Sequence, residues 1–191
     1  MAEAESAETD RAPADRVRDL LGIGYTDLKR ARAIELAVPE AGEEILDWLR
    51  EFAAAGAWRD FASFANLALH LRPEGLTGVL APVIGAGTPG VHLEDLVELL
   101  AETGEAGACT PEAVPALLAL VDVRARHDGP YYGLCLKAVA AIDAIGGPAA
   151  REALRALAFG DVPAPVRRQA AARLGLDGEP GLAERRMVGP A

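Results

Sequence analysis

The chain has 191 residues, of which 51% are hydrophobic and 25% charged, and its formal net charge is −10. Alanine supplies 40 residues, whereas aromatic residues make up only 5%. Alanine ranks first in helix propensity and strands are enriched in aromatic side chains, so this composition favours an all-α protein over an aromatic-rich β-sandwich or barrel.

Ten helical segments are expected from the apolar periodicity and the turn signals. In chain order they are residues 14–21, 27–37, 40–55, 58–71, 74–84, 92–103, 112–124, 130–145, 148–159 and 164–174. Residues 1–12 form an expected disordered acidic tail, residues 13–175 the helical domain and residues 176–191 a C-terminal extension.

The chain shows no sign of export or of a membrane span. Its most apolar window, residues 76–91, is interrupted by Pro82 and Pro89, so we expect no transmembrane helix. The sequence begins Met-Ala-Glu-Ala-Glu, and we expect no secretory signal there. Only Cys109 and Cys135 are cysteines, which fits a reducing compartment, and we expect a cytoplasmic protein.

Prolines mark a repeat along the chain. A proline opens four of the expected helical segments, standing at or one residue before the helix start, namely Pro39, Pro73, Pro111 and Pro148. These prolines are separated by 34, 38 and 37 residues, and a leucine follows seven residues after each of the first three. The fourth copy matches after a shift of one residue. Self-similarity at this period indicates stacked helix pairs, and the alternative is a generic helical bundle.

Two segments carry a resemblance to a known family. Residues 165–175, Pro-Val-Arg-Arg-Gln-Ala-Ala-Ala-Arg-Leu-Gly, resemble the second helix of a bacterial HEAT-like (armadillo-type) repeat. Residues 138–157 resemble the junction between two such repeats. The resemblance implies an α-α superhelix, a solenoid of about four HEAT-like helix pairs, and residues 1–38 would form a short N-terminal helical cap.

Acidic residues are concentrated in the middle of the chain. From Pro73 to Val123 there is no lysine or arginine but there are eight acidic residues. Three of them, Glu94, Glu98 and Glu102, recur at positions i, i+4 and i+8 of one expected helix. Together with the neighbouring Asp95 we call them the acidic ridge. Like charges at this spacing repel by a few tenths of a kcal/mol. Stability gives no reason for the ridge, so it is a candidate partner-binding face; the alternative is an ordinary solvated surface.

Two further groups are candidates for the same surface. Spacings of 4, 3 and 4 residues on the preceding expected helix define a polar stripe of Arg59, Ser63, Asn66 and His70. Second helices commonly line the concave side of α-solenoids, so the polar stripe is expected beside the acidic ridge. Tyr131 and Tyr132 are candidate aromatic anchors for a partner, or they pack on the preceding layer.

Motifs for chemistry find little support. Gly-Ala-Gly-Thr-Pro-Gly at residues 85–90 has the glycine spacing of a dinucleotide-binding turn, but it follows a helix and contains Pro89, so we interpret it as a loop. Histidines and cysteines lack the close spacing of metal ligands, and Ser63 has no nucleophile elbow around it. We therefore expect no metal, no cofactor and no catalytic residue.

The expected function is that of a non-catalytic scaffold, adaptor or immunity-type protein that binds a basic protein through its acidic face. Nucleic acid is not expected as a partner, because phosphate neutralisation requires positive charge and this chain carries −10. The resemblance leaves two enzymatic alternatives open, a HEAT-like alkylpurine DNA glycosylase and a bilin lyase-like accessory enzyme.

Overall fold

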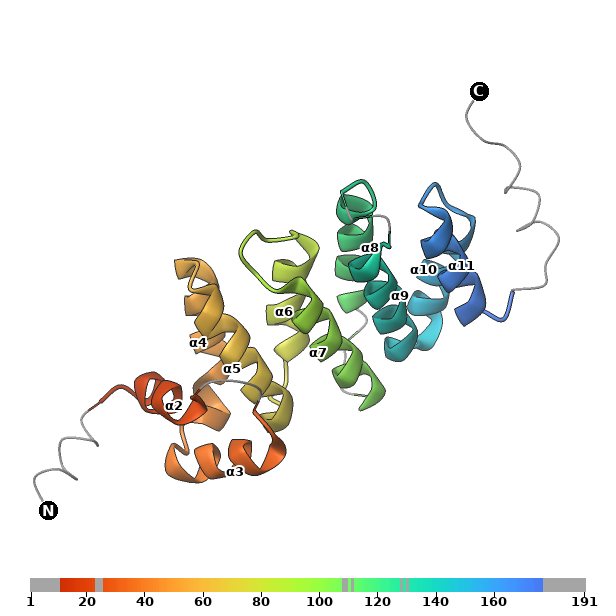
Figure 1. The fold of residues 1–191 in the computed structure, drawn as a ribbon. Coiled ribbons are helices and arrows are strands. Elements are labelled where there is room, and N and C mark those ends of the chain that lie inside the picture. Colours follow the sequence, from red (N-terminus) through yellow and green to blue (C-terminus); the bar gives the residue numbers. More distant parts are fainter. Residues whose placement is uncertain are drawn as a thin grey trace, which may run out of the picture. The chain divides into compact units, whose positions relative to one another are not determined.

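The computed structural model describes residues 11–22, 26–107, 110, 112–127, 129 and 131–176, and over these residues the chain forms ten α-helices and no strand (Figure 1). The helices are α2 (Pro13–Leu21), α3 (Leu28–Ala37), α4 (Ala41–Ala55), α5 (Trp58–Leu71), α6 (Leu76–Gly85), α7 (Leu93–Glu105), α8 (Ala113–Arg124), α9 (Gly133–Ile145), α10 (Gly147–Phe159) and α11 (Ala164–Arg173). The all-α prediction is confirmed, and each predicted boundary lies within three residues of the observed one. The predicted acidic tail and C-terminal extension lie mostly outside the described residues.

The repeated prolines stand at helix starts. Pro148 lies in the first turn of α10, where its missing N–H costs nothing. Pro39 and Pro73 lie in the turns just before α4 and α6, and their carbonyl oxygens accept hydrogen bonds from the N–H groups of Gly42 and Leu76. Pro111 lies outside the described residues. Where it is described, the proline repeat therefore marks where helices begin.

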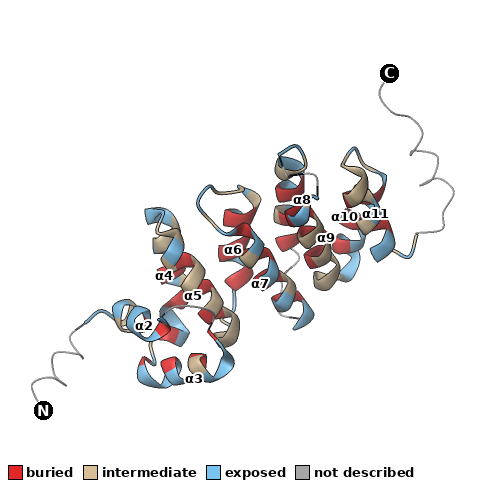
Figure 2. Ribbon diagram, viewed as in Figure 1, coloured by how far each residue is buried: buried red, intermediate tan, exposed pale blue. Residues whose placement is uncertain are grey.

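The repeated apolar positions form the core (Figure 2). The residue ten positions after the proline, or nine in the fourth copy, is buried in all four helices, at Leu49, Val83, Val121 and Leu157. The leucine seven positions after the proline in the first three copies is buried at Leu80 and half-buried at Leu46 and Leu118. Burial of these positions explains why the apolar pattern repeats with the prolines.

Contacts divide the chain into two compact units, and the boundary falls within α6. The N-terminal unit holds the described residues up to Leu80 together with Gly90–His92, and the C-terminal unit holds Ala81–Pro89 and the described residues from Leu93. The N-terminal unit has the aromatic core, in which Trp48 meets Phe64 edge-on with ring centroids 5.8 Å apart. Such a T-shaped pair contributes about 0.5–1.5 kcal/mol beyond its buried area.

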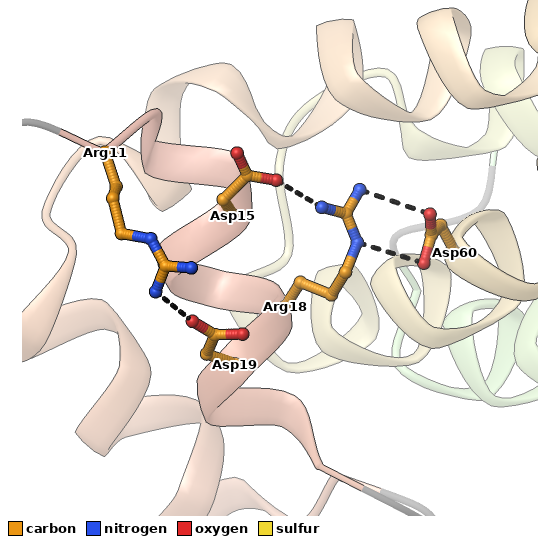
Figure 3. A network of polar contacts seen from close by, with 5 residues as sticks. All are labelled: Arg11, Asp15, Arg18, Asp19 and Asp60. Carbon is orange, nitrogen blue, oxygen red and sulfur yellow. Dashed lines mark hydrogen bonds and ion pairs between the residues drawn. The ribbon is translucent and has the colours of Figure 1, made fainter.

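An arginine network fastens α2 to α5 within the N-terminal unit (Figure 3). The Arg18 guanidinium makes two hydrogen bonds with the Asp60 carboxylate, from Nε at 3.2 Å and from Nη2 at 3.1 Å. It also pairs with Asp15 on its own helix, and its Cζ lies 5.7 Å from the centroid of the Phe52 ring. The bidentate pair fixes the orientation of α2 more than a single ion pair would.

In the C-terminal unit, neighbouring helices pack in succession (Figure 1). α8 packs on α9 and α10 on α11, while α9 also contacts both α7 and α11. Lys137 near the start of α9 reaches Glu94 near the start of α7, and Gly104 near the end of α7 meets Ile145 at the end of α9. α7 and α9 therefore lie side by side and run in the same direction.

Gly104 permits the close approach of these two helices. A Cβ at this position would lie 2.9 Å from the backbone nitrogen of Ile145 and 3.1 Å from the carbonyl carbon of Ala144. Both are backbone atoms, which cannot move aside as the end of a flexible side chain can. The glycine at the end of α7 thus sets the distance between α7 and α9.

Candidate partner-binding surface

The acidic ridge lies on the outer side of α7. Leu93, Leu96, Val97 and Leu100 are buried and hold the helix against its neighbours, whereas Glu94, Glu98 and Glu102 are exposed (Figure 2). Asp95 is half-buried in the first turn, where a carboxylate interacts favourably with the helix dipole. The i, i+4, i+8 spacing predicted one exposed acidic row, and the structure places its three glutamates on the exposed side of α7.

A lysine from another helix occupies part of the ridge. The Nζ atom of Lys137, on α9, lies 2.6 Å from Oε2 of Glu94 and 2.8 Å from Oε1 of Glu98. The sequence analysis missed this residue, because Lys137 lies 43 positions after Glu94. If the proline spacing reflects stacked helix pairs, each second helix would lie on the second helix of the previous pair, and this expectation would have brought Lys137 close to Glu94.

The two carboxylates keep Lys137 positively charged. The hydrogen bond to Glu94, and to a lesser extent the one to Glu98, raises the pKa of Lys137 above its ordinary value. All three side chains are substantially exposed, so the cluster adds little to stability. Within the described part of the chain, Asp95 and Glu102 form no ion pair, and the ridge with Lys137 keeps a formal charge of −3.

The polar stripe on α5 is largely engaged by the chain itself. Oδ1 of Asn66 accepts a hydrogen bond from the Thr26 backbone N–H at 2.7 Å, and Nε2 of His70 donates to the Thr26 carbonyl oxygen at 2.5 Å. Oγ of Ser63 donates to the carbonyl oxygen of Arg59 at 3.0 Å, one turn earlier. Asn66 and His70 therefore hold the segment that precedes α3.

The position of the polar stripe beside the acidic ridge stays a prediction. α5 belongs to the N-terminal unit and α7 to the C-terminal unit. Arg59 is exposed, and Ser63 is half-buried. Of the four stripe residues, Arg59 is thus the one whose side chain is most open to a partner.

The two predicted tyrosine anchors have different environments. The side chain of Tyr131 is 85% exposed, whereas Tyr132 is half-buried at the N-terminus of α9. Tyr132 has φ 51°, a left-handed conformation that is uncommon for a bulky residue. Only Tyr131 is presented to solvent in the way that a docking anchor requires.

The other candidate features form no recognisable metal-binding or catalytic site within the described residues. Among the described residues there is no group of three histidine, cysteine, aspartate or glutamate side chains able to hold a metal ion, and no helix long and apolar enough to cross a bilayer. Cys135 is buried, and Cys109 lies outside the described residues. A hollow of about 320 Å³ in the N-terminal unit, which the sequence analysis did not predict, is lined by Arg11, Arg16, Asp19, Leu20, Ala37 and Val38.

The charged groups that line this hollow already have partners in the chain. Nη1 of Arg11 lies 2.7 Å from Oδ2 of Asp19, and Nη2 of Arg16 donates to the carbonyl oxygen of Ala37 at 2.7 Å. Both guanidinium groups therefore serve to join α2 to its surroundings.

Comparison with known protein families, characterised proteins and solved structures finds no match to this chain. The fold class thus rests on the helices themselves, and the functional assignment rests on the chemistry of the surface.

Proposed function

We propose that the chain is a non-catalytic helical-repeat protein that binds a basic protein through the acidic ridge of α7. The observation that carries the proposal is the exposure of three glutamates on one side of a single helix, with one lysine as their neutralising neighbour. Lys137 offsets the repulsion between Glu94 and Glu98, whereas among the described residues no cation pairs with Glu102, which repels Glu98 at the i, i+4 spacing, so this part of the row does not stabilise α7.

The repeat architecture belongs to this proposal. We interpret α4–α5, α6–α7, α8–α9 and α10–α11 as four HEAT-like helix pairs of a short α-solenoid, with α2 and α3 as the N-terminal cap. The packing of α9 on both α7 and α11, together with the ion pair between Asp143 of α9 and Arg173 of α11, supports this order of second helices. Stacked second helices of this kind, here α7, α9 and α11 of the C-terminal unit, would form one binding face.

Lys137 illustrates the chemistry that the ridge accepts. Its ammonium group is held by Glu94 and Glu98, which lie one turn apart. Asp95 and Glu102 are separated by seven residues, about two turns, so each would meet a separate lysine or arginine of a basic partner. Complementary charge mainly accelerates encounter and excludes wrong partners. The proposed role is therefore that of a scaffold, adaptor or immunity-type protein, with recognition based on charge.

Charge reversal at the unpaired part of the ridge tests the proposal. Lysine at Glu94 or Glu98 would also repel Lys137, so the sharper variant is Asp95→Lys with Glu102→Lys. The matched control is Glu51→Lys with Glu152→Lys, which changes the net charge equally at exposed sites on other helices. The wild type, the ridge variant and the control are each used as bait in a lysate of the source organism, and captured proteins are identified by mass spectrometry.

We expect the wild type and the control to capture the same basic protein, and the ridge variant to lose it. Equal capture by all three baits would refute the ridge as the binding face. Nucleic acid that stays bound to the wild-type bait through washing, together with a salt-sensitive gel shift of duplex DNA, would support the DNA glycosylase alternative instead.

A further inference from the structure

α2 and α3 lie side by side and run in opposite directions. Nη2 of Arg16, in the first half of α2, donates to the carbonyl oxygen of Ala37 at the end of α3. In return, Nε of Arg30, near the start of α3, donates to the carbonyl oxygen of Leu20 near the end of α2 at 3.1 Å. The hollow of about 320 Å³ lies between these two helices, because its lining comes from α2 with its flank and from the end of α3.

Apolar side chains border this hollow and stay open to solvent. Leu20 lines the hollow and is 42% exposed, and Leu36, next to the lining residue Ala37, is 84% exposed. Ala33 shares one side of α3 with Arg30 and Ala37, the two residues that contact α2, because the spacings are three and four residues. Both alanines are exposed. The surface between α2 and α3 therefore carries apolar area that the described chain leaves uncovered.

The same surface is positively charged in a chain of net charge −10. α3 holds three basic residues and one acidic residue, Glu35, so its formal charge is +2. Lys29 and Arg32 precede Leu36 by seven and four residues, so they lie on its side of the helix, and both are exposed. Within the described residues neither forms an ion pair. We name the α2–α3 surface by its exposed residues, Leu20, Lys29, Arg32, Ala33, Leu36 and Ala37.

We propose that the α2–α3 surface is a docking site for an acidic amphipathic helix of another protein. An apolar side chain of that helix enters the hollow beside Leu20, and its carboxylates meet Lys29 and Arg32. Lys29 and Leu36 are about 10 Å apart along α3, so two turns of a partner helix span the surface. Helices that dock in this way place apolar anchors at i, i+3 or i+4, and i+7. The inference is independent of the acidic ridge, which selects the opposite charge.

Charge distinguishes this occupant from two others. A second copy that docked through the same surface would bring Lys29 and Arg32 towards like charges. An anionic membrane typically binds clusters of about four to eight basic residues, whereas this surface offers two unpaired cations on an acidic chain. A helix with both apolar and acidic side chains matches the apolar hollow and the cations together.

Three labelled peptides test the occupant. The first is a fluorescein-labelled peptide of about 15 residues, long enough for an isolated helix, with leucines at i, i+3 and i+7 and glutamates on the flanks. The second has glutamine for every glutamate, and the third has serine for every leucine. In fluorescence anisotropy at low salt, the full chain should bind the first peptide at least about tenfold more tightly than either of the others.

Charge reversals on the protein place the site. Lys29→Glu with Arg32→Glu should weaken binding of the glutamate peptide at least about tenfold. The matched control is Arg151→Glu with Arg155→Glu, which changes the net charge equally at exposed positions of α10 and should keep wild-type affinity. Loss of binding in the α10 variant alone would overturn the proposal, because the acidic peptide would then bind α10.

Leucine replacements test the apolar half of the site. Leu20→Ser with Leu36→Ser should also weaken binding at least about tenfold, whereas Val123→Ser with Tyr131→Ser, at exposed positions of the C-terminal unit, should not. Circular dichroism confirms that each variant is folded. Equal binding of the glutamate and glutamine peptides, or binding unaffected by the leucine replacements, would overturn the proposal. So would a chain that binds no peptide but binds phosphatidylserine vesicles, or that dimerises through these leucines.

Discussion

Replacing Gly104 by alanine tests the packing that positions the acidic ridge. The added Cβ would lie 2.9 Å from the Ile145 backbone nitrogen, so α7 and α9 would have to move apart. Overpacking of this kind costs about 1–3 kcal/mol, and the higher helix propensity of alanine returns up to about 1 kcal/mol. We therefore expect Gly104→Ala to lower the free energy of unfolding by roughly 1–2 kcal/mol.

Thermal unfolding followed by circular dichroism measures this effect. For a chain of this length about 1 kcal/mol corresponds to about 2–4 °C, so the C-terminal unit should unfold about 2–8 °C lower. The matched control is Gly133→Ala at the start of α9, where a Cβ would meet no atom within 4 Å. The control should leave the transition unchanged or raise it slightly. A Gly104→Ala protein as stable as the wild type would refute the close contact of α7 with α9.

Two further predictions concern side-chain contacts. Asn66→Ala leaves the N–H of Thr26, a residue that is only 4% exposed, without its acceptor, so we expect the free energy of unfolding in urea to fall by about 1–3 kcal/mol. Ser63→Ala is the control: its hydroxyl bonds within its own helix, and its loss should cost under about 0.5 kcal/mol. Equal losses in the two variants would contradict the stabilising role of the Asn66–Thr26 hydrogen bond. Lys137 should react more slowly than exposed Lys29 with an amine-acylating reagent at mildly alkaline pH, because the raised pKa of Lys137 leaves less neutral amine. Glu94→Gln with Glu98→Gln should remove the difference, which is measured by peptide mass spectrometry. Equal rates in the wild type would argue against the contacts of the Lys137 ammonium with the two carboxylates.

The helices were predictable because their signals are local. The repeated prolines and apolar positions reveal helix starts and core faces within a short window, which is why each boundary lies within three residues of its prediction. The largest deviation, at the start of α9, coincides with Tyr132 in a left-handed conformation. Helix propensity alone favours a start of α9 before Gly133, because it carries no information on the left-handed turn at Tyr132.

The site was less predictable because its contacts join distant residues. The acidic row on α7 followed from spacing, but its neutralisation by Lys137 depends on which helices lie side by side. Similarly, Asn66 and His70 form a stripe at helical spacing, yet their partner Thr26 lies 40 and 44 residues away.

The central claim is that Asp95 and Glu102 contact positive charge on a protein partner. Calorimetric titration of the captured basic protein into the wild type, the ridge variant and its charge-matched control, at low and high salt, tests this most directly. We predict that Asp95→Lys with Glu102→Lys weakens binding at least about tenfold at low salt and flattens its salt dependence, while Glu51→Lys with Glu152→Lys keeps wild-type affinity. Equal affinity of all three proteins at both salt concentrations would contradict the claim.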